Sequence, residues 1–174
     1  MRIMVLGGDG YLGWPTAMHL AGAGHEILTV DNYLRRLIAR STRSEPLIDA
    51  PNLEDRADTF TSTGGAEIAV AIADCADMMQ LDSVFADFMP DAVIHYAEQP
   101  SAPYSMRGLP EAQLTMRNNL GVTFNLIWAI LRHNPDCQIV KLGTSVEYGT
   151  PNIDIEEGWI DIEHKGRKDK FLFP

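Results

Sequence analysis

Short apolar runs and longer segments with helical periodicity alternate along the chain. The apolar runs are continuous, with no regular polar positions between, which is typical of strands that are buried on both faces of a sheet. Strands separated by helices in this way predict a parallel sheet with right-handed crossovers. The expected strands are 3–6, 26–30, 68–72, 92–95 and 138–142, and the expected helices are 11–23, 78–89 and 110–133.

Two stretches depart from this alternation. Residues 34–65 are polar and contain several prolines and glycines, so we expect a short helix and a loop there. Near the C-terminus, polar and apolar residues alternate over 160–163, and a turn signal predicts that 168–173 returns as a hairpin partner. We therefore expect one domain over residues 1–149 and the truncated start of a substrate-binding region over 150–174.

Composition narrows the class of protein. The 174 residues, 45% of them hydrophobic, suffice for one sizeable core. The net charge of −10 argues against nucleic acid or an anionic membrane as a partner, because both would be repelled. Cys75 and Cys137 stand apart, so we expect reduced thiols and no metal site. The first strand starts too early for a signal peptide, and no apolar run approaches about 18 residues, so we expect a cytoplasmic protein.

A glycine-rich turn, residues 7–13, follows the first predicted strand and opens a predicted helix. The middle glycine leaves room for a pyrophosphate, the last lets the helix lie close to the strand, and the helix N-terminus offers N–H groups to phosphates. Asp31 ends the second strand, where a carboxylate accepts ribose hydroxyls and repels a 2′-phosphate. The pattern predicts a Rossmann-type doubly wound parallel sheet that binds NAD in preference to NADP, or one that has lost its ligand. The expected contacts are Gly7, Gly10, Tyr11, Leu12, Gly13 and Asp31.

Polar residues also follow the second and third predicted strands, at the edge where open α/β sheets bind ligands. After the second strand, Asn32 precedes Arg35 and Arg36, whose guanidinium groups could bind phosphate oxygens bidentately or form a solvated basic turn. After the third come Asp74 and Cys75. A carboxylate there can accept from the adenine amino group, or it can cap the next helix. All five residues are candidate cofactor contacts.

The fourth predicted strand ends at His95, which we interpret as a core histidine with satisfied hydrogen bonds. Ala97 is small enough for the chain to pass beneath a cofactor, and Glu98 would lie beside the pyrophosphate or the nicotinamide ribose. Asn118 and Asn119 lie within a predicted helix, where asparagine is unfavourable. We expect their face of the helix to point toward the cofactor site, with a solvent-facing polar helix surface as the alternative.

The spacing of Gly7, Gly10 and Gly13 resembles that of extended short-chain dehydrogenases/reductases, which act on nucleotide sugars. The resemblance implies that a Ser or Thr after the fifth strand binds the sugar hydroxyl that is oxidised, and Thr144 matches it. Glu147 follows closely and could act as a general acid or base if burial raises its pKa. We therefore expect both residues to be catalytic, although the Asp-Glu pair of sugar 4,6-dehydratases does not follow Thr144.

Several segments together resemble the UDP-sulfoquinovose synthase family. They are 7–14, 30–32 with the arginines that follow, 101–106, 141–144 and, most specifically, 147–158. The resemblance implies UDP-glucose and sulfite as substrates and UDP-sulfoquinovose as product. It also implies that NAD⁺ oxidises glucose C4, water is lost across C5 and C6, sulfite adds at C6, and hydride returns to C4. Thr144 would hold the C4 oxygen and Glu147 would serve the elimination.

Two departures from the family pattern bear on activity. Pro100 stands where the family has an arginine. The Tyr-x-x-x-Lys pair that removes the C4 hydroxyl proton is absent, because none of the five tyrosines is followed four positions later by lysine. The chain stops at Pro174, near the expected start of that pair's helix, so we expect the cofactor-binding half of a longer enzyme. A non-catalytic NAD-binding module and another nucleotide-sugar epimerase or dehydratase remain alternatives.

The oligomeric state is open at this stage. A complementing C-terminal half or a second copy of the chain would be a suitable partner. The predicted helix 110–133 carries apolar side chains that could form a dimer face or pack on the sheet, and we favour packing on the sheet. These side chains are Leu126, Ile127, Ile130 and Leu131.

Overall fold

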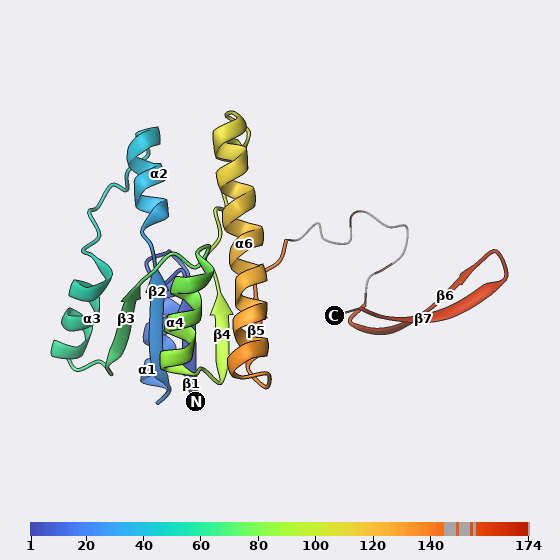
Figure 1. Ribbon diagram of the computed structural model, residues 1–174, viewed down its shortest axis with the longest axis horizontal. Coiled ribbons are helices and arrows are strands. Elements are labelled where there is room, and N and C mark those ends of the chain that lie inside the picture. Colours follow the sequence, from blue (N-terminus) through green and yellow to red (C-terminus); the bar gives the residue numbers. More distant parts are fainter. Residues whose placement is uncertain (145–148, 150–153, 155, 174) are drawn as a thin grey trace. The chain divides into compact units, whose positions relative to one another are not determined.

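The computed structural model spans residues 1–174 and describes all of them except 145–148, 150–153, 155 and 174 (Figure 1). The chain divides into two compact units, Met1–Leu142 and Gly143–Pro174. The first unit holds a parallel sheet and its helices, and the second holds a hairpin. The domain boundary expected between residues 149 and 150 stays a prediction.

The first unit contains a five-stranded sheet with the order β3-β2-β1-β4-β5, and all of its strands are parallel. The order reverses between β1 and β4, which creates the switch point where sheets of this class bind ligands. The predicted fold class, a Rossmann-type doubly wound sheet, is thus confirmed. The strands are β1 (Arg2–Leu6), β2 (Glu26–Asp31), β3 (Ile68–Ile72), β4 (Ala92–His95) and β5 (Gln138–Lys141).

Helices cover both faces of this sheet (Figure 1). On one face, the central strands pack against α4 and α6 through a cluster that includes Phe85 and Leu126. On the other face, α1 and α3 supply Ala17 and Phe60 to a second cluster. The helices are α1 (Gly13–Gly22), α2 (Leu34–Thr42), α3 (Leu53–Ser62), α4 (Met78–Phe88), α5 (Ala102–Ser105) and α6 (Leu109–His133).

The expectation of one short helix and a loop over residues 34–65 is wrong, because the structure contains two helices there. Asn52 caps α3 by accepting a hydrogen bond from the Asp55 N–H at 2.7 Å. Leu53 and Ala57 lie on one face of α3 and are buried. An amphipathic helix with a capping side chain is stabilised at its N-terminus and by its packing, which the polar composition concealed.

The expectation that every strand is buried on both faces fails at both edges of the sheet. At β3 only Ile68 is buried, and at β5 all four residues are exposed. The reason is their position, since each is an edge strand and pairs with one neighbour alone in the part of the chain described. The long helix beside β5 is buried on one side only. Leu126 and Ile130 pack in the core, as we expected, whereas Ile127 and Leu131 are exposed.

The second unit contains an antiparallel hairpin of β6 (Gly158–His164) and β7 (Arg167–Phe173). Lys165 and Gly166 form the two-residue turn, with φ of 52° and 76°. Left-handed φ at both central positions is the requirement of a type I′ hairpin turn, which explains glycine at the second. In the described residues, no helix combines the length and apolar character that crossing a bilayer requires.

Candidate cofactor-binding site

The glycine-rich turn between β1 and α1 is packed too closely for side chains at two of its glycines. A Cβ on Gly13 would lie 2.0 Å from the Gly7 carbonyl oxygen, and one on Gly7 would lie 2.8 Å from the Tyr96 carbonyl group. Gly7 also has a φ of 84°, which disfavours other residues. Its N–H donates to the Val30 carbonyl at 2.8 Å. The turn therefore brings the start of α1 directly over the ends of β1 and β2.

The N-terminus of α1 has the features of an anion site. Leu12 is its N-cap residue, and no side chain caps the helix. Tyr11 and Leu12 lie exposed at this end. An uncapped helix N-terminus presents backbone N–H groups and a positive dipole to solvent. This arrangement, together with the small residues of the turn, fits the pyrophosphate of a dinucleotide.

Asp31 lies at the end of β2, next to this turn. Its Oδ2 accepts a hydrogen bond from the Asp9 N–H at 2.9 Å, and its Oδ1 accepts from the Tyr33 N–H at 2.7 Å. Burial raises the pKa of Asp31, while these backbone N–H groups act against that rise. The carboxylate is thus held in a fixed orientation at the edge of the sheet, where ribose hydroxyls could donate to it.

The ends of β2 and β3 are joined by side chains. Asn32 donates from Nδ2 to Asp74 Oδ1 at 3.1 Å, and Asp74 Oδ1 also accepts from the Ala76 N–H at 3.0 Å. The alternative that Asp74 caps the next helix is wrong, because Asp77 is the N-cap of α4 and accepts from Met79 N–H at 2.9 Å. Asp74 instead fixes the turn between β3 and α4, and its role toward adenine stays a prediction.

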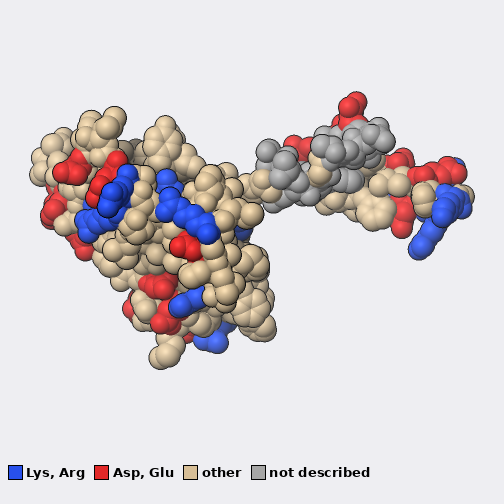
Figure 2. Space-filling view, turned by 90° about the horizontal axis from the view of Figure 1, so that it is seen from above, with Lys and Arg blue, Asp and Glu red and all other residues tan. Residues whose placement is uncertain are grey.

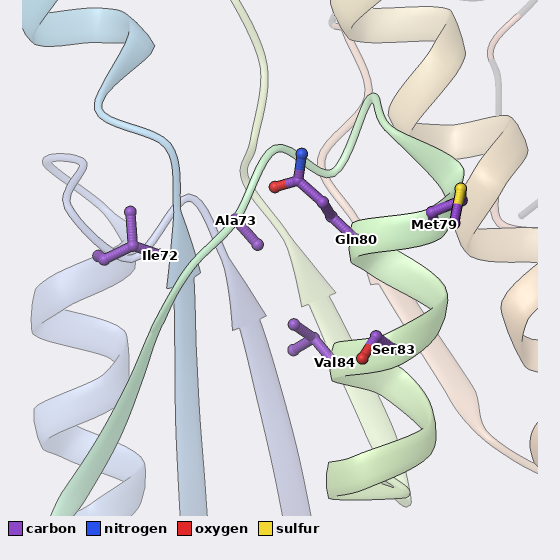
Figure 3. A pocket seen from close by; sticks show the side chains of 6 residues that line it. All are labelled: Ile72, Ala73, Met79, Gln80, Ser83 and Val84. Carbon is purple, nitrogen blue, oxygen red and sulfur yellow. The ribbon is translucent and has the colours of Figure 1, made fainter.

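Cys75 and a shallow hollow lie beside this turn. Burial raises the pKa of the Cys75 thiol to about 12, so the side chain is a neutral core group. The hollow has a volume of about 350 Å³ and lies between the end of β3 and α4 (Figure 3). Gln80, at its rim, accepts from the Asp74 N–H at 3.0 Å and donates to Asp77 at 3.1 Å. Its remaining lining is mostly apolar: Ile72, Ala73, Met79, Ser83 and Val84.

Arg36 has protein partners in the structure, whereas the two alternatives expected for it were contacts with phosphate oxygens and a solvated basic turn. It donates from Nε and Nη2 to the two Asp9 carboxylate oxygens at 2.7 and 2.6 Å. Arg56 of α3 donates to the same carboxylate. Arg35 is exposed. Sequence reasoning missed the Asp9 carboxylate and Arg56, and the only available signal was the amphipathic spacing of α3, which would have placed Arg56 on a helix.

His95, at the end of β4, is a core histidine as predicted. It is fully buried, its Nδ1 accepts from the Ala97 N–H at 3.2 Å, and its Nε2 lies 3.2 Å from Thr123 Oγ1. Burial, and secondarily the charge of Lys141, lower the pKa of His95 to about 4. The imidazole is therefore neutral at pH 7 and serves the structure of the loop that follows β4.

The polar residues after β4 are held by α6. Asn118 is buried and donates from Nδ2 to the Ala97 carbonyl at 3.1 Å. Asn119 donates to the Gln99 carbonyl at 3.1 Å and accepts from the Gln99 N–H at 2.8 Å. The two asparagines thus face the strand-end loop and not solvent, and their role toward the cofactor stays a prediction. The Glu98 carboxylate lies 2.9 Å from Lys141 Nζ of β5.

The two predicted catalytic residues belong to the second unit, and the structure does not place them relative to the cofactor residues. Thr144 is exposed. Glu147 lies outside the described residues.

Within the described ranges, no group of three or more acidic, histidine or cysteine side chains could hold a metal ion. Figure 2 views the molecule from above, and in the first unit the Lys and Arg side chains lie among acidic ones.

Comparison with known proteins identifies relatives over nearly the whole chain. The chain is 43% identical to UDP-sulfoquinovose synthase from the chloroplast of Spinacia oleracea, over 99% of its own length and 36% of that protein. It is 38% identical to UDP-sulfoquinovose synthase from Sulfolobus acidocaldarius, over 100% of its length and 44% of that protein. The chain thus spans less than half the length of both relatives.

Solved structures show the same fold. UDP-glucose 4-epimerase from Bifidobacterium longum, crystallised with NAD⁺ and UDP, superimposes with a TM-score of 0.66 at 24% identity. The similarity covers 88% of this chain and 40% of the epimerase.

Residues 3–161 match the family described as NAD dependent epimerase/dehydratase. NAD is the cofactor of that family, and the glycine-rich turn, the uncapped helix and Asp31 fit it. The chain therefore belongs to the NAD dependent epimerase/dehydratase family.

Proposed function

We propose that this chain is the NAD-binding part of a UDP-sulfoquinovose synthase, which converts UDP-glucose and sulfite to UDP-sulfoquinovose. The observation that carries the proposal is the Asp31 carboxylate held beside the glycine-rich turn and the uncapped N-terminus of α1. The 43% identity to the spinach relative supports the choice of this reaction among those of the family. Because the chain covers 36% of that relative, the activity is proposed for the longer protein.

In this proposal each part of the site has one task toward the cofactor. Bound NAD supplies a hydride acceptor and later a hydride donor for the sugar. The N–H groups at the start of α1 bind the diphosphate, and Asp31 accepts the adenosine ribose hydroxyls. Asn32 and Asp74 border the adenine, with Cys75 as an apolar wall.

The strand-end loop after β4 forms the opposite side of the proposed site. Asn118 holds the Ala97 carbonyl through a hydrogen bond of 3.1 Å, which keeps this small residue in position beneath the dinucleotide. Glu98 and Lys141 form an ion pair of 2.9 Å at the ends of β4 and β5. The pair places a fixed polar group near the reacting end of the cofactor, where its carboxylate can accept from ribose hydroxyls.

The sugar chemistry is assigned to Thr144 and Glu147. Thr144 would hold the oxygen at glucose C4, and Glu147 would move the proton during the loss and addition at C5 and C6. A Tyr-x-x-x-Lys pair would come from a C-terminal segment beyond this chain or from a complementing polypeptide. A partner, either that segment or a second copy, is consistent with the exposed apolar side chains Leu120, Phe124 and Trp128 on α6.

The test is formation of UDP-sulfoquinovose from UDP-glucose and sulfite. The 174 residues alone should give negligible turnover, because one missing general base costs about 10²–10⁴ in rate. Adding a C-terminal half that contains the Tyr-x-x-x-Lys pair should restore it. Glu147→Gln and Thr144→Ala should then suppress product, whereas Glu67→Gln, at an exposed position before β3, should not. Robust synthesis by residues 1–174 alone would contradict the assigned division of labour.

Two other functions give different results in that assay. A non-catalytic NAD-binding module would bind NAD but stay inactive with any C-terminal half. A UDP-glucose 4-epimerase would form UDP-galactose without sulfite. The 31% identity to UDP-glucose 4-epimerase from Bacillus subtilis, over 87% of this chain and 39% of that protein, is the observation for that alternative.

A further inference from the structure

One carboxylate of the glycine-rich turn lies between two guanidinium groups. The Asp9 side chain is 8% exposed, and Arg36 binds both of its oxygens, at 2.7 and 2.6 Å. Arg56 donates to Asp9 Oδ1 and, at 3.3 Å, to the Asp9 carbonyl. The arginines come from α2 and α3, so three separate segments meet at this carboxylate. Bidentate pairing of this kind is the geometry in which arginine also binds phosphate.

This cluster adjoins the residue proposed to bind the adenosine ribose. The Asp9 N–H donates to Asp31 Oδ2 at 2.9 Å, and the charge of Asp9 contributes to the raised pKa of Asp31. Two positive and two negative side chains therefore meet at this edge of the sheet. NADP differs from NAD by a 2′-phosphate on that ribose, so a dianion at this place would encounter both arginines if their donors were available.

Both arginines have anchors that do not involve Asp9. Arg36 donates to the carbonyls of Ala50 at 2.9 Å and Pro51 at 2.7 Å, and its guanidinium carbon lies 5.0 Å from the centre of the Tyr33 ring. Arg56 lies over the Trp14 ring at 5.0 Å. These contacts would keep the two cations near the ribose edge when the Asp9 carboxylate is removed.

We propose that Asp9 is a cofactor-selectivity residue, which occupies the two guanidinium groups beside the ribose site and thereby excludes NADP. The inference rests on the proposed binding of NAD. Asp31 repels the 2′-phosphate directly. Asp9 acts through Arg36 and Arg56, because it takes the donors that would otherwise bind that phosphate.

The test is the ratio of the two dissociation constants, for NADP⁺ and NAD⁺, measured by calorimetry on the purified protein. Asp9→Asn keeps the backbone N–H that binds Asp31 and removes the charge. We expect the ratio to fall by about 10- to 100-fold, the factor that one or two charge-assisted hydrogen bonds give. Asp9→Ala, which cannot accept from either arginine, should move the ratio in the same direction. Damage to the fold would weaken the binding of both cofactors equally and leave the ratio unchanged.

Two further variants separate the proposed route from a general effect of charge. Arg36→Gln added to Asp9→Asn should reverse most of the gain in NADP binding, because one freed guanidinium is lost. Asp82→Asn is the matched control. It removes a carboxylate that pairs with Arg132 at 2.8 Å in the last turn of α6, away from the glycine-rich turn, and should leave the ratio unchanged.

The outcomes distinguish this inference from the proposed function. A lowered ratio in both Asp9 variants, reversed by Arg36→Gln, supports the role of Asp9. An unchanged ratio in variants that still bind NAD overturns it and leaves NAD binding intact. A gain in NADP binding that persists with Arg36→Gln overturns the route through that arginine. Failure of the unmutated protein to bind NAD would overturn both.

Discussion

The glycine-rich turn and the outer side of α6 differ in how completely their side chains and backbone are used. At the turn, Gly7 and Gly13 lie within contact distance of neighbouring backbone, the Asp31 carboxylate accepts two hydrogen bonds, and the Asp9 carboxylate accepts from two arginines. On the outer side of α6, large apolar side chains are exposed in the described part of the chain. These are Met116, Leu120, Phe124, Ile127, Trp128 and Leu131.

The difference indicates that the two regions are covered by different parts of the protein. The turn is completed by segments between β1 and α3 and by the loop after β4, all within the first unit, so its geometry is set by this chain. Within the first unit, the outer side of α6 and the neighbouring strand β5 have no such cover. Exposed apolar surface of this extent is typical of an interaction face. Substitutions in the two regions should therefore have unequal effects on stability.

The largest expected effect separates the two sides of α6 with the same substitution. Leu126 is 1% exposed and Leu120 is 61% exposed. Leu126→Ala removes core contacts and should lower the free energy of unfolding by about 2–5 kcal/mol. Leu120→Ala should change it by about 0.5 kcal/mol or less. Denaturant titration of both variants measures the contrast. Equal losses of unfolding free energy in the two variants would contradict the contrast between the two sides of α6, because they would mean that the outer side is covered.

The next effect tests the close packing of the turn. Gly13→Ala would place a Cβ 2.0 Å from the Gly7 carbonyl oxygen, so the turn must shift. We expect a loss of about 1–3 kcal/mol in unfolding free energy, with weakened NAD binding. Gly22→Ala is the matched control in the same helix, where an added Cβ meets nothing within 4 Å. It should stabilise by about 0.4–1 kcal/mol. Thermal melts that rank the two variants in the opposite order would refute close packing at Gly13.

A pH dependence is expected from His95, between the two regions. The fold lowers its pKa from 6.5 to about 4, chiefly through burial. The stability that the neutral imidazole contributes is fully present above pH 6.5 and is lost as the pH falls toward 4, because the unfolded chain then binds the proton more tightly. Between pH 7 and pH 5 the loss should be about 2 kcal/mol. Denaturant midpoints should fall accordingly.

Two histidine variants identify the source of this change of stability with pH, which appears as a slope in a plot of unfolding free energy against pH. His95→Gln should flatten it, whereas His19→Gln, at an exposed position of α1, should not. A slope that survives His95→Gln would assign the pH dependence to other groups. Asp77 and Asp82 have lowered pKa values, so their contributions to stability are lost only below the pH range of this test.

Local patterns sufficed to predict much of the fold. Short apolar runs marked all five strands of the sheet, although only the inner strands β1, β2 and β4 are largely buried, and the periodic segments marked α1, α4 and α6. The polar stretch that contains α2 and α3 was predicted as one short helix and a loop, because only Leu53 and Ala57 of its two helices are buried. The exposure of β5 was also missed, since an apolar run does not tell which strand lies at the edge.

The candidate site shows the same limit. The glycine spacing and Asp31 are close in sequence, and the strand-turn-helix context made them recognisable. The pairing of Asp9 with Arg56 joins residues that are 47 positions apart, and nothing in either segment indicates it. Asp74 was left with two interpretations, an adenine contact or the cap of the next helix, and Asp77, which is the N-cap of α4, was not considered.

The central claim, that the edge formed by the glycine-rich turn and Asp31 binds NAD, is tested most directly by calorimetric titration of the purified protein with NAD⁺ and NADP⁺. The account predicts tighter binding of NAD⁺. It also predicts that Asp31→Ala weakens NAD⁺ binding by about 1.5–3 kcal/mol, because charged hydrogen bonds to the ribose are lost. Asp82→Ala should leave NAD⁺ binding unchanged. Equal affinity for the two cofactors, or NAD⁺ binding that Asp31→Ala does not alter, would contradict it.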